Sequence, residues 1–542
     1  MKGAAGEHRG RYARTTLPAI AGLIVLIAWG ATPTPMEHVL PVATSEITVA
    51  GTSRLPAFPG AQGGGSLSKG GRGGRVYEVT SLDDSGAGSL RECVQASGAR
   101  TCVFRVAGTV VLRSVLRLRN PYITIAGQTS PGGVQVRAAK TPGEGGPFNG
   151  ALVQVVTHDV VIRYLRLRHG RTDPVDNKQN GHPIKLNDGA YNVIVDHCSI
   201  YWTQDENVGI WTIHDPIHDV TFSWNIVTEP LHGHPTNFAI AADRASGKHA
   251  QMVNLDFHHN FIGTSSHRNP NMTIGTTRWI NNVIYNFSSR ATQIGGATRG
   301  DLIGNIYRLG PASGSARRVR EIVWRNDPAY PGSPSLYVFG NKSSHHPDPA
   351  ATGSEWSDMV GTATSENGAD TGPLSAAYRR TTPLPAAGVP MVAEPASTLE
   401  ASMGLAGAGA LFPVGASRRL DANGAWVDAS DSTDRRVIQE YRTNTAPSAL
   451  PNDGTPSTIA AGTPYRDADH DGMPDAWERA HGLDPSDASD GNRTSSDGNT
   501  NLERFLNGQP HPVAAGPGSS PGPEERDGRR KQHLKGMPRP SG

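Results

Sequence analysis

The stretch Leu255-Asp-Phe-His-His-Asn260 ends on an asparagine, and its pattern recurs as Thr277-Arg-Trp-Ile-Asn-Asn282 and Gly300-Asp-Leu-Ile-Gly-Asn305. In these six-residue segments the first and third residues are mostly apolar, and the sixth position is a slot that is usually asparagine. Seven such slots follow one another along the chain. They hold Leu165, Cys198, Asn225, Asn260, Asn282, Asn305 and Asn341, which are 33, 27, 35, 22, 23 and 36 residues apart.

This spacing predicts a chain that winds in coils, because a minimum of about 22 residues with a variable excess suits rungs of short strands joined by extensible loops. An inward asparagine at a bend can hydrogen-bond the turn backbone and the amides of the asparagines above and below it. A β-sandwich would place turn signals roughly every 8–12 residues and alternate more strictly. We therefore predict an all-β fold, a right-handed parallel β-helix.

Composition supports the same class. The chain has 542 residues with 64 Gly and 41 Pro, is 36% hydrophobic and 18% charged, and is too turn-rich for coiled coils or helical bundles. Its 51 Lys and Arg against 49 Asp and Glu give a net charge of +2, which argues against nucleic-acid or membrane-surface binding by bulk charge. The length predicts more than one folded unit.

The N-terminus predicts export, since arginines up to Arg14 precede the apolar stretch from Leu17 to Trp29, which is short for a membrane span. Cys93 and Cys102 lie close enough in sequence to form a disulfide, and Cys198 is expected as a buried thiol. We expect six segments: a signal peptide (1–30), a linker (31–55), the β-helix (56–345), an Ala/Pro/Gly-rich segment packing on it (346–465), a calcium module (466–508) and a disordered tail (509–542).

Four polar side chains occur at a common offset after successive slots. Each could be an ordinary surface group, but loops of variable length do not readily keep a common offset by chance. We therefore predict that these side chains stack in one groove across which an extended polymer can lie. They are Glu206, His232, Arg268 and Arg290, which follow their slots by eight, seven, eight and eight residues.

Several stretches then carry a family resemblance. They are Phe58-Pro-Gly-Ala-Gln-Gly-Gly-Gly, Ser81-Leu-Asp-Asp-Ser-Gly-Ala-Gly-Ser-Leu-Arg91, Val195-Asp-His-Cys-Ser199 with Asp205-Glu206-Asn207, and Phe257-His-His-Asn260 followed by Arg268-Asn-Pro270. In order and spacing they resemble the pectate lyases of polysaccharide lyase family 1. The resemblance covers roughly residues 58–341. It implies cleavage of polygalacturonate by β-elimination on a parallel β-helix, usually with calcium.

The resemblance also implies residue roles. In the family an arginine of an Arg-x-Pro-x-x-Arg motif abstracts the C5 proton, and Arg268 stands at that position, although Thr273 replaces the second arginine. A family lysine that contacts the substrate carboxylate falls on His232. One calcium-binding acid falls on Glu206. The other family calcium acids align with Asn180, His182 and Ile210, so either the catalytic calcium is missing or it is rebuilt from Asp205, Glu206 and Asp173 or Asp176.

The β-elimination reaction explains why a cation and a base are needed in the site. The C5 proton is α to a carboxylate, so a cation must stabilise the enolate-like charge that develops when the proton leaves. Arginine is a poor base in water, with a pKa above about 12, and its use as a base requires a shielded site crowded with positive charge. His232 is the reserve candidate for the base. We assign Arg268 and His232 to catalysis, and Arg290, His267 and His259 to substrate binding.

Near the C-terminus, the stretch Asp467-Ala-Asp-His-Asp-Gly-Met-Pro-Asp-Ala-Trp-Glu478 follows the EF-hand ligand plan. A glycine at loop position 6 permits the bend, and further aspartates follow up to Asp497, so the unit resembles the paired calcium loops of dockerin or thrombospondin type 3 repeats. We predict that it binds Ca²⁺. The expected ligands are Asp467, Asp469, Asp471, Met473 through its backbone carbonyl, Asp475 and Glu478.

We therefore predict a secreted, monomeric pectate lyase that acts on an acidic plant-type polysaccharide and binds neither nucleic acid nor membrane. Two alternatives stay open. A β-helix hydrolase of the polygalacturonase type needs paired carboxylates at a suitable separation, whereas the predicted groove offers Asp205 and Glu206 on one rung and basic groups beyond. A non-catalytic carbohydrate-binding or adhesin-like β-helix would cleave nothing.

Overall fold

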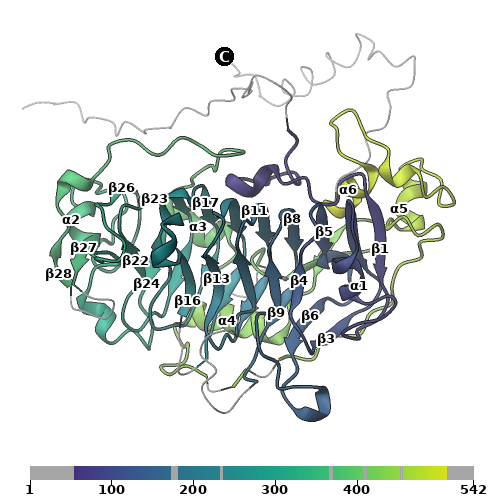
Figure 1. The fold of residues 1–542 in the computed structure, drawn as a ribbon, viewed down its shortest axis with the longest axis horizontal. Coiled ribbons are helices and arrows are strands. Elements are labelled where there is room, and N and C mark those ends of the chain that lie inside the picture. Colours follow the sequence, from purple (N-terminus) through teal and green to yellow (C-terminus); the bar gives the residue numbers. More distant parts are fainter. Residues whose placement is uncertain are drawn as a thin grey trace, which may run out of the picture. The chain divides into compact units, whose positions relative to one another are not determined.

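The computed structural model describes residues 54–172, 181–231, 236–364, 370–406, 412–451, 453–454 and 456–508. Most of its strands pair in parallel with the strand one coil earlier and the strand one coil later. Three long sheets result, and they run side by side along the molecule (Figure 1). The fold is a parallel β-helix, which confirms the class predicted from the asparagine slots. None of the described helices is both long and apolar enough to cross a membrane.

We call the three sheets the first, the second and the third. The first contains β1 (Arg75–Val79), β2 (Arg100–Phe104), β5 (Ile123–Ala126), β8 (His158–Arg163), β11 (Tyr191–Asp196), β14 (His218–Ser223), β17 (Leu255–His258), β20 (Thr276–Ile280), β23 (Arg299–Ile303) and β26 (Ser335–Phe339). The second contains β4 (Leu116–Leu118), β7 (Val153–Val155), β10 (Ile184–Asn187), β13 (Glu206–Thr212), β16 (Thr236–Ala242), β19 (Asn271–Thr273), β22 (Thr292–Gly295), β25 (Ile322–Arg325), β27 (Val360–Ala363) and the antiparallel β28 (Asp370–Pro373). The third contains β3 (Gly108–Leu112), β6 (Val134–Ala138), β9 (Arg166–Arg168), β12 (Ser199–Tyr201), β15 (Ile226–Thr228), β18 (Phe261–Ile262), β21 (Val283–Tyr285) and β24 (Ile306–Arg308).

The core of the β-helix lies inside the coil, where successive rungs place large apolar side chains on top of one another. Phe222, Phe257 and Trp279 stack through the first sheet with ring centroids 5.7 and 4.2 Å apart. All three are buried. Burying an aromatic or branched side chain stabilises a fold by about 1.5–3 kcal/mol, so these stacks hold the rungs in register.

The slot asparagines form the predicted ladder at the bend between the first and third sheets. Each donates from Nδ2 to Oδ1 of the next, and a buried partner closes each end of the row. At one end the Cys198 amide donates to Asn225 Oδ1 at 2.8 Å, and at the other Asn341 Nδ2 donates to Glu355 Oε1 at 2.9 Å. The steps Asn225 to Asn260, Asn260 to Asn282, Asn282 to Asn305 and Asn305 to Asn341 measure 2.9, 2.9, 3.1 and 2.9 Å.

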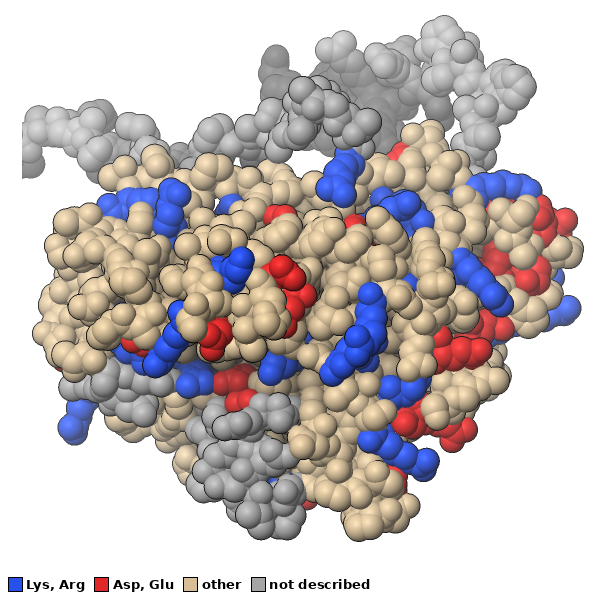
Figure 2. Space-filling model, in the orientation of Figure 1, with Lys and Arg blue, Asp and Glu red and all other residues tan. Residues whose placement is uncertain are grey.

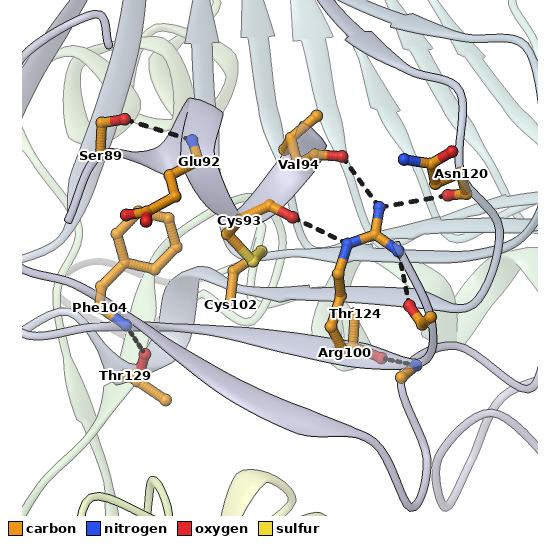
Figure 3. The surroundings of a disulfide bond; sticks show 12 residues. Ser89, Glu92, Cys93, Val94, Arg100, Cys102, Phe104, Asn120, Thr124 and Thr129 are labelled. Atoms are coloured by element: carbon orange, nitrogen blue, oxygen red, sulfur yellow. Dashed lines mark hydrogen bonds between the residues drawn. A yellow bond between two sulfur atoms is a disulfide. The ribbon is translucent and has the colours of Figure 1, made fainter. Parts of the chain in front are cut away.

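A short helix, α1 (Leu90–Gln95), packs against the first coils of the β-helix. Ser89 caps it by accepting from the Glu92 amide, and Cys93 on the helix forms a disulfide with Cys102 of β2 (Figure 3). The buried Arg100 donates to the carbonyls of Cys93 and Val94, at 2.8 and 2.9 Å. The disulfide left open by the sequence is therefore formed, and Cys198 is a buried free thiol, as predicted.

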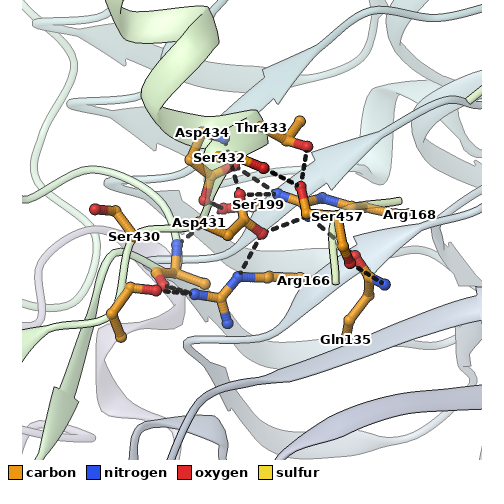
Figure 4. A network of polar contacts seen from close by, with 12 residues as sticks. Gln135, Arg166, Arg168, Ser199, Ser430, Asp431, Ser432, Thr433, Asp434 and Ser457 are labelled. Atoms are coloured by element: carbon orange, nitrogen blue, oxygen red, sulfur yellow. Dashed lines mark hydrogen bonds and ion pairs between the residues drawn. The ribbon is translucent and has the colours of Figure 1, made fainter. Parts of the chain in front are cut away.

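The chain after the β-helix returns along the third sheet. There α4 (Ser432–Thr443) is held by a buried network of ion pairs (Figure 4). Arg168 Nη2 lies 2.8 Å from Asp434 Oδ1, and Arg166 Nε lies 3.0 Å from Asp431 Oδ2. Removing one partner of such a buried pair costs about 3–5 kcal/mol, because it leaves an uncompensated charge.

Short elements complete the described chain. The helices are α2 (Glu355–Met359), α3 (Ala396–Ser402), α5 (Asp475–Ala480) and α6 (Asn501–Leu506), and a hairpin joins β29 (Arg418–Leu420) to β30 (Trp426–Asp428). The 3-10 turns are η1 (Gly64–Leu67), η2 (Gly127–Thr129), η3 (Pro142–Glu144), η4 (Arg244–Ser246), η5 (Lys248–Gln251), η6 (Ser315–Arg318), η7 (Ala376–Tyr378) and η8 (Asp490–Asn492).

Candidate active site

A groove of about 590 Å³ lies on the outer face of the second sheet. Its floor is formed by outward positions of β13 and β16 that hold small residues, Gly209, Ala239 and Ala241, so a ligand can approach the backbone closely. On the face shown in Figure 2, acidic and basic side chains lie close together across the middle of the β-helix. The charged and aromatic residues that line the groove are His182, Lys185, Asp205, Glu206, Trp211, Arg244, Arg268, Arg325 and Tyr330.

Glu206 and Arg268 meet in this groove, as the common offset predicted. Glu206 is the first residue of β13 and pairs in register with Thr236, which in turn forms a bridge with His267. Arg268 Nη1 donates to Glu206 Oε1 across the intervening rung. The Arg268 backbone has a φ of 59°, and its carbonyl accepts from the Phe238 amide at 2.9 Å. The backbone geometry therefore fixes the position from which the Arg268 side chain extends.

A second asparagine ladder, which the sequence analysis missed, holds these residues in place. Asn207 Nδ2 donates to Asn237 Oδ1 at 2.8 Å, and Asn237 Nδ2 donates to Asn269 Oδ1 at 2.8 Å. All three asparagines are buried. Glu206 and Arg268 directly precede the first and last asparagine of this ladder. In the sequence, this ladder could have been predicted from the dipeptides Glu206-Asn207, Thr236-Asn237 and Arg268-Asn269, which place an asparagine at the same position of three successive rungs.

His182 joins the two acids of the groove. Its Nε2 lies 3.2 Å from Asp205 Oδ2, and its Nδ1 lies 2.9 Å from the Glu206 carbonyl oxygen. One ligand atom from each of these three residues lies within 4.8 Å of the others. Calcium takes about 6–8 oxygen ligands, whereas this described set supplies two carboxylates and a nitrogen, and Arg268 already binds Glu206. The described donors therefore do not fit a calcium site.

The other predicted site residues lie in four kinds of place. Arg290 is buried one rung beyond Arg268, where the Asn269 amide donates to the carbonyl of the following Ala291 at 2.9 Å. His267 adjoins Arg268 at the edge of the groove. His232 lies outside the described residues, as do Asp173, Asp176 and Asn180. Ile210 points into the core and is no ligand.

His259 does not belong to this groove, which corrects its assignment. It follows β17 of the first sheet, stacks on Trp224 with ring centroids 4.5 Å apart, and has Nε2 3.1 Å from Glu394 Oε1. It lines a separate depression together with Phe58 and Arg163. His259 occupies the position just before a slot asparagine, so its offset differs from that of Arg268 and its side chain points away from the second sheet.

The C-terminal module also holds a cluster of acids. Asp467, Asp469 and Asp471 form one group, and Asp471, Glu478 and Asp490 form an adjoining one. Both carboxylate oxygens of Glu478, together with Asp471 Oδ2 and Asp490 Oδ1, are buried and have no hydrogen-bond partner in the described chain. Burial and then the neighbouring acids raise the pKa of Glu478 to about 8, and burial raises that of Asp471 to about 8. These donors fit a hard cation such as Ca²⁺.

One of the predicted ligands in this module needs correction. Asp475 Oδ2 lies 3.1 Å from both Arg466 Nε and Arg479 Nη2, so it faces these cations instead of the acidic cluster. Asp490, from the second loop, joins the cluster in its place. The Met473 side chain packs in the apolar cluster of the module, and its amide donates to Asp471 Oδ1 at 2.9 Å.

The fold and the groove define the class of this protein: a parallel β-helix with charged side chains lining a groove on one sheet. Among solved structures, the major cedar pollen allergen Jun a 1 aligns with a TM-score of 0.44 at 17% identity, covering 63% of this chain and 90% of that chain. Residues 14–326, more than half of the chain, match the family model described as pectate lyase. Probable pectate lyase C of Neosartorya fischeri is 30% identical over 466 residues, 84% of this chain and 93% of that protein.

The corresponding protein of Aspergillus flavus is 30% identical over 465 residues, 84% of this chain and 94% of that protein. The family model and these relatives show that the chain belongs to the pectate lyase family. This membership confirms the enzyme class predicted from the sequence, a polysaccharide lyase that acts on pectate.

Proposed function

We propose that the groove of the second sheet binds polygalacturonate and that Arg268 abstracts the C5 proton of the reacting unit. The observation that carries this proposal is the placement of Arg268, which a left-handed backbone and the second asparagine ladder fix at the groove beside Glu206. Fixed orientation of a base against its proton supplies much of the catalysis in a proton abstraction.

The proposed reaction is a β-elimination. The C5–H pair of electrons forms the C4–C5 double bond, the bond from C4 to the glycosidic oxygen breaks, and that oxygen takes a proton as it leaves. The negative charge that develops at the uronate carboxylate needs cations close by. Lys185, Arg244 and Arg325 line the groove with Arg268, against the two acids Asp205 and Glu206. These cations favour binding of the polyanion. The Glu206 carboxylate favours the charged form of Arg268, so the role of base requires that this ion pair opens when the substrate binds.

The remaining predicted roles belong to the same proposal. Arg290 and His267 bind substrate carboxylates next to the reacting unit, and His232 assists catalysis. Trp211 is partly exposed in the groove and offers a flat apolar surface for a sugar ring. Among the described groove residues, the carboxylates are the adjacent Asp205 and Glu206, which do not form the separated pair that glycoside hydrolysis requires.

We also propose that the C-terminal module binds Ca²⁺ through Asp467, Asp469, Asp471, Glu478 and Asp490, and through the backbone carbonyl of Met473. The buried carboxylates without partners support this assignment, because an ion would neutralise charges that otherwise cost several kcal/mol each. Secretion and a monomeric state are part of the proposal. Secretion is supported by the N-terminal apolar stretch and by the Cys93–Cys102 disulfide, since disulfides persist in oxidising compartments.

The activity is tested by following the absorbance of the unsaturated product on polygalacturonate. Arg268→Ala is expected to lower kcat by at least about 100-fold, the usual effect of losing a base. Arg268→Lys keeps the charge but not the reach of the guanidinium, so it should lose nearly as much kcat while KM changes less than about threefold. A variant at position 268 that keeps wild-type kcat would remove Arg268 from the role of base.

A further inference from the structure

A second depression, of about 540 Å³, surrounds β4 at the N-terminal end of the second sheet. Four arginines line it, and no acidic side chain does so among the described residues. Arg91 is neutralised by Asp84, with Nη2 2.5 Å from Oδ1. The other three are Arg113, Arg117 and Arg119, which we call the distal arginines.

The distal arginines are exposed and have no carboxylate partner in the part of the chain that the structure describes. Arg113 Nε donates to the Glu144 backbone oxygen at 2.9 Å, while the Glu144 carboxylate pairs with Arg137 at 2.6 Å. Arg117 Nε donates to Gln154 Oε1 at 2.6 Å. Three positive charges therefore stand close together, and no carboxylate of the described residues balances them.

The strand register places this depression in line with the active-site groove. Arg117 of β4 pairs with Gln154 of β7, Gln154 with Lys185 of β10, and Lys185 with Gly209 of β13. Lys185 and Gly209 line the groove that holds Arg268. A single outward row of residues thus runs from the distal arginines to the groove.

We propose that the distal arginines form a remote subsite that binds carboxylates of the same polygalacturonate chain whose reacting unit lies at Arg268. This inference rests on the proposed function. Five strand-to-strand steps separate β4 from β19, next to Arg268. At about 4.8 Å per step they span about 24 Å. A sugar unit of an extended chain is about as long as one step, so only chains of about six or more units reach both places.

The lining of the depression favours an acidic polysaccharide over a nucleic acid. Sites for single-stranded nucleic acids combine basic groups with aromatic side chains on which bases stack. The uncharged residues here are Val94, Gln95, Ser114, Val115, Asn120 and Asn149, with no aromatic ring among the described lining residues.

The test replaces all three distal arginines by glutamine and compares kcat/KM on long polygalacturonate with kcat/KM on trigalacturonate. The ratio of the two values is expected to fall about tenfold at low salt, through KM on the long chain, because three ion pairs of modest strength are lost. The difference should shrink as salt is added. A matched control replaces three exposed arginines associated with the first sheet: Arg75, Arg299 and Arg379.

A ratio that stays at the wild-type value in an active enzyme would overturn the inference and leave the proposed function standing. Gel retardation by polygalacturonate tests the subsite separately from the activity. If the chain cleaves no pectate, the proposed function fails, but the subsite is still tested by this binding measurement. In an Arg268→Ala background, polygalacturonate in the gel should retard the parent protein and the control, and retard the triple variant clearly less. Equal retardation of all three, or retardation by a DNA oligonucleotide and not by polygalacturonate, would contradict the subsite.

Discussion

At the scale of single residues, His258 shows how burial sets a charge state. Its imidazole is 2% exposed, and burial, followed by the neighbouring His259, lowers its pKa to about 3. The unfolded chain has an ordinary histidine pKa of about 6.5. Between these values the unfolded state binds the extra proton, so stability present at neutral pH is lost as the pH falls below about 6.5.

We expect this group alone to remove about 2 kcal/mol of unfolding free energy between pH 7 and pH 5. His258→Gln should flatten the pH dependence of stability by that amount, as measured by urea unfolding at several pH values. His214→Gln, at an exposed position, is the control and should keep the wild-type slope. An unchanged slope in His258→Gln would mean that the buried imidazole takes up a proton in the folded protein.

The residues of the site differ in how far the sequence predicted them. Glu206 and Arg268 share an offset from the first ladder, and the structure brings them into contact. Lys185 and Arg325 could not be found in this way, because they stand at outward positions of short strands whose sequences carry no repeated mark. The sequence assigns His259 to substrate binding, but its place beside a slot asparagine turns its side chain toward a separate depression.

At the scale of elements, the second asparagine ladder is expected to carry both stability and activity. Asn237→Ala removes the middle amide, which donates to Asn269 Oδ1 at 2.8 Å and accepts from Asn207 Nδ2 at 2.8 Å. Leaving buried polar partners without hydrogen bonds costs about 1–3 kcal/mol for each group. We expect a loss of about 2–4 kcal/mol in urea unfolding, together with a fall in kcat on polygalacturonate, since Arg268 directly precedes Asn269.

Asn305→Ala is the matched control, because it breaks the first ladder far from the groove. It should cost a similar unfolding free energy, through its bonds to Asn282 and Asn341, while kcat at a temperature where it is folded stays near the wild-type value. Equal losses of kcat in the two variants would show that the second ladder has no special part in placing Arg268.

The β-helix itself was predictable because the first ladder recurs at fixed positions within each rung. The third sheet and the Arg166, Arg168, Asp431 and Asp434 network were not predicted. The partners in this network lie more than 260 residues apart. Nothing local in the sequence links a strand of the third sheet to a helix so distant along the chain.

At the scale of the whole molecule, the C-terminal module packs against the first coils of the β-helix, so the two ends of the described chain lie together (Figure 1). Arg72 Nε lies 2.7 Å from Glu503 Oε1, and Arg163 Nη1 donates to Asn507 Oδ1 at 2.8 Å. The sequence indicated the acids of this module but not its place, since the contacts join residues more than 300 positions apart. An ion bound here would stabilise the folded chain.

Calcium is therefore expected to raise the melting temperature of the wild-type protein over that in chelator. Glu478→Gln and Asp467→Ala should lose this increase. Asp467→Ala should clearly lower the melting temperature in calcium, while its lyase activity at a temperature where it is folded changes little. In chelator, Glu478→Gln should melt no lower than the wild type, because it removes a buried carboxylate without a partner. Asp475→Asn, whose carboxylate faces two arginines, should keep the calcium response. A calcium response that survives in Glu478→Gln would argue against the assigned ligands.

The groove of the second sheet is proposed to cleave pectate by elimination, with Arg268 as its base. The most direct measurement is the mass of the fragments released from polygalacturonate by the wild-type enzyme and by Arg268→Ala. Elimination predicts that wild-type fragments carry a double bond at the new end and are one water lighter than hydrolysis products, and that Arg268→Ala releases almost none. Saturated fragments carrying the mass of an added water, or unsaturated fragments from Arg268→Ala at the wild-type rate, would contradict the account.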